Sequence, residues 1–140
     1  SKEETIFSLF DHIAIRNLVG ALETVNVLLL SHSSHALQIT SALIGQFQRL
    51  IRFKELVING SSTQDALQKL RIFGKQMQRS YLQAHRSYKD VEMEPIYQVI
   101  VEFDARIRNL NREMVEPLLQ LLLYHIVVRG GRGVWRQFHN

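Results

Sequence analysis

Residues 39–56, ITSALIGQFQRLIRFKEL, decide the fold because they form an unbroken amphipathic pattern. Gln48, Arg52 and Glu55 fall on one side of this segment, and the apolar residues fall on the other. The pattern predicts a long helix with one side in a core, although such a face also suits contact with a partner, and it indicates no function by itself. The apolar residues recur at steps of three and four positions, as on one face of a helix: Ile39, Leu43, Phe47, Leu50, Phe53 and Val57.

Helical periodicity extends over the rest of the chain. Only two prolines and seven glycines interrupt 140 residues, and no segment alternates apolar and polar residues for long enough to predict a strand. We therefore expect an all-α protein, a compact bundle of six or seven helices that is stabilised by tertiary packing. One domain is expected over residues 1–129, followed by a flexible tail over residues 130–140. The helices are expected near residues 4–15, 18–31, 34–58, 62–70, 74–87, 91–109 and 113–128.

Short polar residues and prolines indicate where the helices begin and end. Asn17 predicts a break after the first helix, and Ser62, with an acidic residue three positions later, resembles a capping box. Asp90 is a candidate cap for the sixth helix. Proline is best tolerated in a first helical turn, so the last two helices are expected to begin close to Pro95 and Pro117, or to kink there.

Composition and charge exclude several classes of protein. The chain has no cysteine, so disulfides, thiol nucleophiles and thiolate metal sites are impossible, which is compatible with the cytoplasm. The longest apolar run, residues 118–128, is interrupted by Gln120 and His125 and is too short to cross a bilayer. The formal net charge is +4, and residues 69–140 carry twelve Lys or Arg against seven Asp or Glu. This basic half favours an acidic protein partner or weak attraction to nucleic acid.

Several segments in a fixed order resemble a known family. They are IFSLFDHIAIRN at Ile6–Asn17, the leucine-rich Ala21–Leu30, the QFQRLIRFKEL helix that begins at Gln46, FDARIR at Phe103–Arg108 and the apolar run Leu118–Leu123. Together they cover roughly Thr5 to Arg129 and are similar to the C-terminal domain of the bacterial DNA polymerase III delta subunit, a component of the clamp loader. The absence of an initiator methionine fits a domain excised from a longer chain.

The resemblance implies a fold of the clamp-loader collar type, the oligomerisation domain that follows the AAA+ domains. It implies partners, which are the corresponding domains of the gamma/tau and delta-prime subunits. The function would be assembly of the clamp loader that places the sliding clamp on DNA during replication. Contact with the sliding clamp belongs to the N-terminal domains of the family, and ATP hydrolysis belongs to gamma/tau. No catalysis and no cofactor are therefore expected of this chain.

Motif searches give an enzyme little support. The sequence contains no phosphate-binding Gly-rich loop, no HExxH and no G-x-S-x-G. His32 and His35 lie close together without a third metal ligand, so we expect them to cap a helix or to face solvent. His12 and His125 fall within apolar helices and are expected to be packed side chains. A small helical enzyme of the chorismate-mutase type would need arginine and glutamate to converge inside the bundle, and no motif predicts this.

Eight polar residues are candidates for contact with partner proteins. Three lie on the helix after Gly45, three form a basic stripe along the fifth helix, and two lie near the end of the sixth helix: Gln46, Arg49, Arg52, Lys75, Arg79, Arg86, Asp104 and Arg108. The alternative function is a helical nucleic-acid-binding or regulatory domain that uses the basic stripe, which we define as Lys75, Arg79 and Arg86. Tyr81 and Tyr88 flank this stripe, where they would be available to stack on bases. A cationic face that only solvent covers remains the simplest explanation of the stripe.

Overall fold

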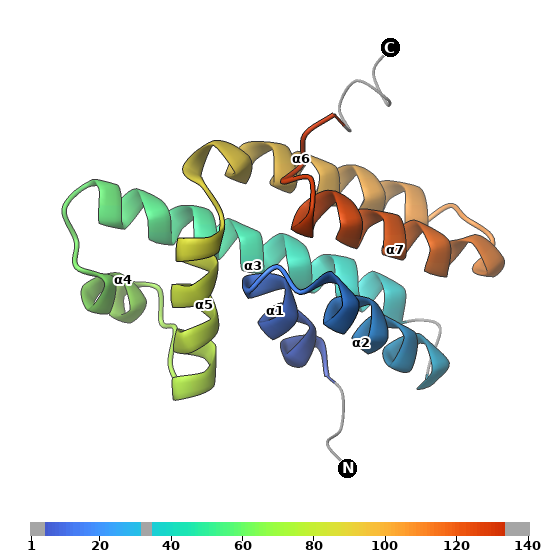
Figure 1. The fold of residues 1–140 in the computed structure, drawn as a ribbon, viewed down its shortest axis with the longest axis horizontal. Coiled ribbons are helices and arrows are strands. Elements are labelled where there is room, and N and C mark those ends of the chain that lie inside the picture. The colour runs from blue at the N-terminus through green and yellow to red at the C-terminus, as the bar shows by residue number, and fades with distance from the viewer. Residues whose placement is uncertain (1–4, 32–34, 134–140) are drawn as a thin grey trace.

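The computed structural model describes residues 5–31 and 35–133. Within them the chain is all-α, with no strand, as predicted (Figure 1). Each helix begins and ends within two residues of its predicted bounds, because the apolar spacing and the local caps determine both. The helices are α1 (Ile6–Ala14), α2 (Leu18–Ser31), α3 (His35–Ile58), α4 (Thr63–Lys69), α5 (Lys75–Ser87), α6 (Asp90–Ile107) and α7 (Arg112–Val127).

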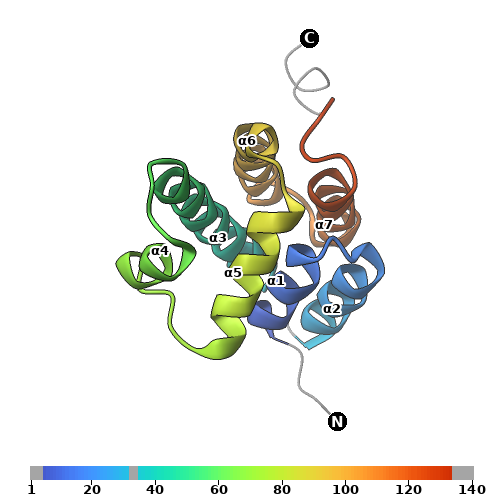
Figure 2. The same ribbon diagram turned by 60° about the vertical axis from the view of Figure 1, so that its left-hand side comes forward.

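The longest helix, α3, runs along the long axis of the molecule and packs most extensively against α6 (Figure 1). Helix α7 lies beside α6 and contacts α2 on its other side. Helix α1 occupies the centre, where α2, α3, α5 and α7 all contact it (Figure 2). Helix α5 crosses one end of α3, and the short α4 packs on the same end of α3.

The predicted stripe of α3 forms the centre of the core. Its residues from Ile39 to Phe53 are at most 1% exposed, and Val57 at its end is half-buried. The Phe47 ring packs edge-on against Phe10 of α1, with ring centroids 6.4 Å apart, and against Tyr88, at 5.8 Å. Replacing a buried phenylalanine by alanine costs about 3–5 kcal/mol of stability. Phe47 therefore joins three segments of the chain through one side chain.

Local polar groups set the helix starts. Thr5 and Ser8 form a reciprocal capping box on α1, with hydrogen bonds of 2.9 and 3.1 Å between each backbone N–H and the other hydroxyl. The Oδ1 atom of Asn17 accepts from the Gly20 N–H at 3.1 Å, so the predicted break also caps α2. Ser62 caps α4 as predicted. Asp90, expected to be the cap of α6, is instead its first residue, because the chain enters the helix one position earlier.

The expectation that α6 and α7 begin near their prolines is wrong. Each helix begins five residues before its proline, so Pro95 and Pro117 lie in the second turn. A proline there removes one backbone hydrogen bond, to the carbonyl four residues earlier. Those carbonyls belong to Val91 and Glu113, which are both exposed residues. Solvent is therefore close to the unpaired carbonyls, and each helix continues through its proline.

The chain after Arg129 does not leave the domain at the predicted point. Gly130 and Gly131 are buried. The Gly131 N–H donates to the His125 carbonyl at 2.8 Å, and the Gly130 N–H donates to the Ile126 carbonyl at 3.2 Å, so both continue the end of α7. Their φ angles of +58° and +77° belong to the left-handed region, which glycine adopts without strain. The packed structure thus includes both glycines, and residues 134–140 of the expected tail lie outside the described residues.

Candidate functional site

Six of the eight candidate contact residues lie at the surface. Gln46 and Asp104 are instead buried, so neither offers its side chain to a partner in this structure. Asp104 accepts hydrogen bonds from the Thr40 hydroxyl at 2.6 Å and from Nε of Arg108 at 3.1 Å, so it ties α6 to α3. Gln46 is buried beside the apolar stripe, and its Oε1 atom has no hydrogen-bond partner among the described residues. Arg49 is half-buried and the other five are exposed: Arg52, Lys75, Arg79, Arg86 and Arg108.

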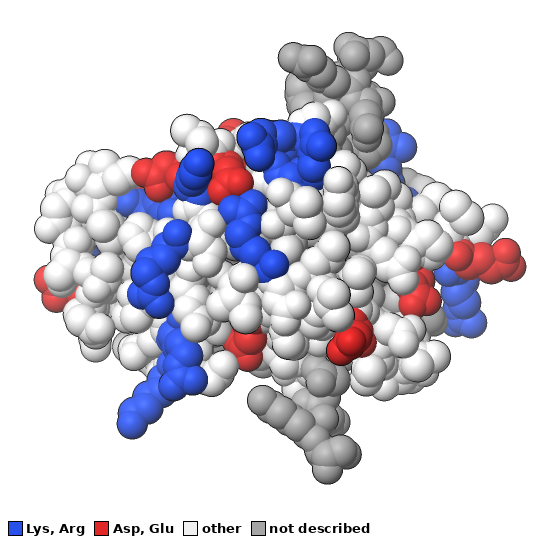
Figure 3. All heavy atoms as spheres, viewed as in Figure 1, with Lys and Arg blue, Asp and Glu red and all other residues white. Residues whose placement is uncertain are grey.

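The basic stripe follows the outer side of α5. In Figure 3 lysine and arginine side chains succeed one another along this helix, and acidic side chains are sparse beside them. The flanking tyrosines are both 1% exposed. Tyr81 packs on Phe10 with centroids 5.0 Å apart, and the Tyr88 hydroxyl donates to the Ile13 carbonyl at 2.7 Å. Neither ring is available to a base, so the stripe lacks the stacking groups that the nucleic-acid hypothesis assigned to it.

A second cationic site lies between α3 and the end of α4, and we call it the α3–α4 hollow. Its volume is about 460 Å³. Its four cationic side chains face no carboxylate among the lining residues, and none of the four forms an ion pair in the part of the chain that the structure describes. The lining residues are Gly45, Gln48, Arg49, Arg52, Lys69, Leu70 and Arg71.

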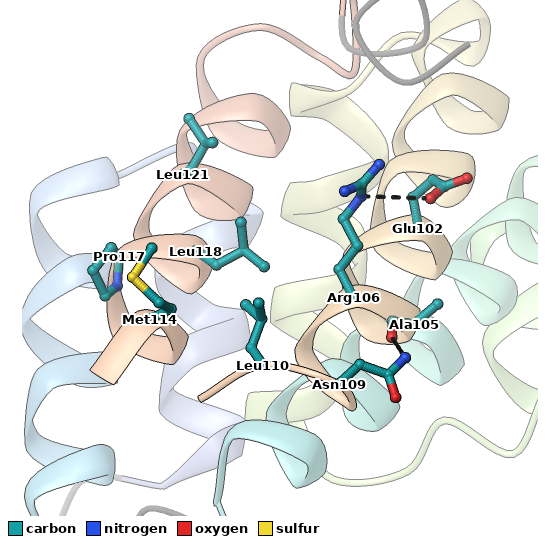
Figure 4. A pocket seen from close by; sticks show the side chains of 9 residues that line it. All are labelled: Glu102, Ala105, Arg106, Asn109, Leu110, Met114, Pro117, Leu118 and Leu121. Atoms are coloured by element: carbon teal, nitrogen blue, oxygen red, sulfur yellow. Dashed lines mark hydrogen bonds and ion pairs between the residues drawn. The ribbon is translucent and has the colours of Figure 1, made fainter. Parts of the chain in front are cut away.

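An apolar groove of about 710 Å³ lies between the end of α6 and the beginning of α7, and we call it the α6–α7 groove (Figure 4). Met114 is 54% exposed, Leu121 44% and Leu110 38%. On the α6 side, Arg106 and Glu102 form an ion pair at 3.8 Å. The groove thus has an apolar floor and a charged edge.

The groove was missed in the sequence, although a signal for it exists. Met114, Leu118 and Leu121 recur at steps of four and three, so they form a second apolar stripe on α7. The first stripe, which includes Leu119 and Leu122, is buried in the core. Two adjacent apolar stripes on one helix indicate two contacts, and within the described residues Met114 and Leu121 of the second stripe stay exposed. When residues 118–123 are interpreted as a single apolar run, they predict only the contact with the core.

Inside the bundle, arginine and glutamate do converge, at Arg16 and Glu92. Arg16 donates to both carboxylate oxygens of Glu92, and to the Ser87 and Val127 carbonyls at 2.8 Å each. These hydrogen bonds from Arg16 lower the pKa of Glu92 despite its burial. Both groups are fully engaged in joining helix ends. They therefore form a structural ion pair.

Lys54 is a second charged side chain in the interior. Its ammonium group donates to the Tyr88 carbonyl at 2.7 Å and to the His85 carbonyl at 2.9 Å. It also lies 3.3 Å from a carboxylate oxygen of Asp90. A cation at the carboxyl end of α5 satisfies carbonyls that have no partner within the helix. Burial and the charge of Lys54 lower the pKa of His85, which is therefore kept neutral.

The described histidines are not grouped with other potential metal ligands. Within residues 5–31 and 35–133, no three His, Asp or Glu side chains are placed to hold a metal ion. His35 lies 2.9 Å from the Leu28 carbonyl, and His12 lies 3.3 Å from the Asn17 amide. His125 is buried, as expected, but its Nδ1 atom has no partner among the described residues. His32 lies outside the described residues.

Comparisons with known proteins give the family. None of the helices among the described residues is both long and apolar enough to span a bilayer. No curated protein and no solved structure matches the chain. A family model does match, over residues 3–126, and its description is the C-terminal domain of the DNA polymerase III delta subunit. That span covers all of α1 to α6 and nearly all of α7, so the chain belongs to the family formed by the C-terminal domains of DNA polymerase III delta subunits.

Proposed function

We propose that this domain assembles a delta subunit into the clamp loader of the cytoplasm, by packing against the corresponding domains of neighbouring subunits. Gamma/tau and delta-prime are the partners that the family implies, and the domain itself catalyses no reaction. The observation that carries the proposal is the α6–α7 groove, in a chain whose family model covers residues 3–126.

The groove has the chemistry of a protein contact. Isolated apolar side chains at a surface need no explanation, but a contiguous apolar patch with a polar edge is typical of an interaction site. Leu118 extends from α7 toward α6 above Leu110, and Met114 and Leu121 line the α7 side of the groove (Figure 4). The Arg106–Glu102 pair at the edge offers charges to a partner. A helix of a neighbouring subunit that places leucine or phenylalanine in the groove would bury these side chains.

The positions of the charged and apolar sites suit a ring of unlike subunits. The groove lies where α6 ends and α7 begins. In Figure 1 that junction is at one end of the molecule, and α5, which carries the basic stripe, lies toward the other end. A subunit within a ring meets two different neighbours through two different surfaces. We assign the groove to one neighbour and the exposed cations at the opposite end to the other, with Arg52 and Arg79 as representative residues.

Co-purification with the gamma/tau and delta-prime C-terminal domains tests this proposal. Met114→Glu/Leu121→Glu puts charges in the groove and is expected to abolish capture of one partner. Val91→Glu is the matched control, because Val91 is 79% exposed and lies far from the groove on the first turn of α6. Retained capture of both partners by the groove variant would remove the groove from the interface.

A separate variant tests the charged end of the domain. Arg49→Glu/Arg52→Glu reverses two charges on α3 and is expected to weaken capture of the second partner by at least tenfold, since charge reversal across an interface is strongly repulsive. Unchanged capture of both partners would exclude this part of α3 from the contact. If neither double variant affects assembly, neither surface makes the subunit contacts on which the proposed function rests.

A further inference from the structure

We propose that the α3–α4 hollow binds the phosphate groups of a polyanion, carried by a nucleic-acid strand or by a free polyphosphate. This site is distinct from the α6–α7 groove, and it shares Arg49 and Arg52 with the charged surface that we assign above to the second neighbour. It also differs from the basic stripe, which lies on α5. Four side chains from two segments carry the site: Arg49, Arg52, Lys69 and Arg71.

The charge of the hollow is unbalanced within the protein. Among the described residues, its four cations have no carboxylate partner, whereas four other cations of the domain do: Arg16, Lys54, Arg106 and Arg108. Lys69 donates only to the Ser61 hydroxyl, at 3.2 Å, and the Arg49 guanidinium lies 5.9 Å from the Tyr81 ring centroid. Like charges that converge on one concave surface repel each other and attract an anion strongly. The gathering of four cations on one concave surface therefore favours an anionic ligand.

The backbone around Arg71 places this cation at the hollow. Arg71 has φ of +57°, a left-handed conformation that is uncommon for a residue with a side chain. Its turn closes α4 through hydrogen bonds from the Arg71 N–H to Gln68 and from the Ile72 N–H to Leu67, and it buries Ile72 completely. Glycine would make this turn without strain. The arginine instead adds a guanidinium to the wall of the hollow, and strained residues of this kind concentrate at binding sites.

Phosphate fits the hollow better than a carboxylate or a base. Three of the cations are guanidinium groups, whose planar arrays of N–H donors match phosphate oxygens. One carboxylate would neutralise a single cation of the four, whereas successive phosphates of a polyanion bring a charge each. No aromatic side chain lines the hollow, so no base would be stacked there. Binding is therefore expected to depend on phosphate and to be independent of nucleotide sequence.

Gly45 leaves the floor of the hollow open. A Cβ atom added at Gly45 would meet no atom within 4 Å. A phosphate can therefore approach α3 between the side chains of Arg49 and Arg52. The same open space makes Gly45 the best place for a test, because a side chain there enters the hollow without disturbing the packing of the protein.

The test uses the 140-residue chain and fluorescence anisotropy with a labelled twelve-nucleotide single strand at about 50 mM salt, where phosphate-driven binding is strongest. Inorganic tripolyphosphate is the unlabelled competitor and is also titrated alone by calorimetry. Gly45→Glu places a carboxylate among the four cations and is expected to weaken binding by at least tenfold. Gly45→Ala is the matched control and is expected to stay within twofold. Arg71→Gln is expected to weaken binding and to reduce the salt slope by about one.

Each result of the test decides the proposal. If either phosphate probe binds the parent chain and Gly45→Glu abolishes that binding, the proposal is supported. The probe that binds more tightly then identifies the source of the phosphate. No binding of either probe at about 50 mM salt overturns it. The proposal is also overturned if binding survives Gly45→Glu and Arg71→Gln but is lost in Lys75→Gln/Arg79→Gln. The basic stripe would then be the binding site. Preference for polyglutamate over both phosphate probes assigns the hollow to an acidic protein instead. Capture of the partner that we assign to the groove is expected to be normal in Gly45→Glu, which separates this site from the groove.

Discussion

Arg16 and Glu92 form a two-pronged ion pair across the domain, with Nη1 and Nη2 of the arginine 3.0 and 2.9 Å from the two carboxylate oxygens. Arg16 lies in the turn between α1 and α2, and Glu92 lies in the first turn of α6. The same guanidinium donates to the Ser87 and Val127 carbonyls at the ends of α5 and α7, and it lies 4.2 Å from the Tyr88 ring centroid. One side chain thereby joins the ends of three helices to the centre of the fold.

Replacing Glu92 by glutamine is expected to lower the free energy of unfolding by about 2 kcal/mol. The variant keeps the shape of the side chain but leaves the charge of Arg16 without its counterion, and a hydrogen bond to a charged group contributes about 1.5–3 kcal/mol. Urea unfolding followed by circular dichroism measures the change. Glu94→Gln is the control, because Glu94 is an exposed carboxylate on the same helix and is expected to change stability by less than about 0.5 kcal/mol. Equal effects of both substitutions would contradict a role for the ion pair.

The ionisation of the Glu92 carboxyl group should also affect how the stability of the domain depends on pH. The hydrogen bonds from Arg16 lower the pKa of Glu92 below its ordinary value of 4.5, so the unfolded chain binds this proton more tightly than the folded one. The stabilisation is therefore complete above about pH 4.5 and is lost as the pH falls through the lowered pKa of the folded state. Unfolding curves of the parent chain and Glu92→Gln should differ at neutral pH and converge in acid. A constant difference over this range would show that Glu92 stabilises the fold by packing alone.

His125 should give a second pH dependence, closer to neutrality. Burial, and then the charge of Arg129, lower the pKa of His125 below 6.5, so the imidazole is neutral in the fold. As the pH falls below 6.5, the unfolded chain takes up a proton that the folded chain resists, and stability decreases. His125→Phe keeps the ring contact with Phe103, whose centroid lies 6.1 Å away, and removes the titrating group. We expect the variant to gain stability relative to the parent chain as the pH falls to about 5. A pH-independent difference would refute this explanation.

The sequence predicted the helices well, because local spacing and local caps determine them. Ser62, for example, caps α4 through the backbone of Asp65, three positions later, and the helical spacing of the α3 stripe predicts the burial of Phe47. The family assignment also came from local motifs and is confirmed. The candidate contact residues were less predictable, since exposure depends on partners that are distant in the sequence. Asp104 has the charge of a surface residue, but Thr40, 64 positions away, accounts for its burial.

The glycines also show that tertiary contacts are not predictable from the sequence alone. A glycine by itself predicts flexibility, whereas its environment decides whether a side chain would fit. Gly45 sits in an open hollow, Gly20 lies against His12 and Asn17, and Gly131 lies against the backbone of α6. These differences come from tertiary packing, which a single sequence does not show. Substitution by alanine therefore separates the three positions experimentally.

Alanine at Gly45 is expected to stabilise the domain, and alanine at Gly20 to destabilise it. Gly45 lies inside α3 with open space beside it, so alanine should add about 0.5–1 kcal/mol through its better helix propensity. A Cβ at Gly20 would lie 2.6 Å from Cε1 of His12 and 2.7 Å from Nδ2 of Asn17, the residue that caps α2. Displacing the cap and the ring should cost about 1–3 kcal/mol. Thermal unfolding of both variants measures the difference, and a shift of the same sign in both would contradict the packing described here.

Alanine at Gly131 is expected to cost about 3 kcal/mol, which tests whether the end of the chain belongs to the fold. A Cβ there would lie 2.6 Å from the backbone nitrogen of Ile96 and 2.6 Å from the carbonyl carbon of Pro95, and neither is able to move without bending α6. Gly133→Ala is the matched control. Its φ of +83° gives alanine a similar backbone strain of about 1–2 kcal/mol, but its Cβ meets only the mobile end of Arg129, at 3.1 Å. Urea unfolding should therefore show a clearly larger loss at Gly131 than at Gly133. Equal losses would mean that backbone strain alone is measured and that this segment does not pack on α6 in solution.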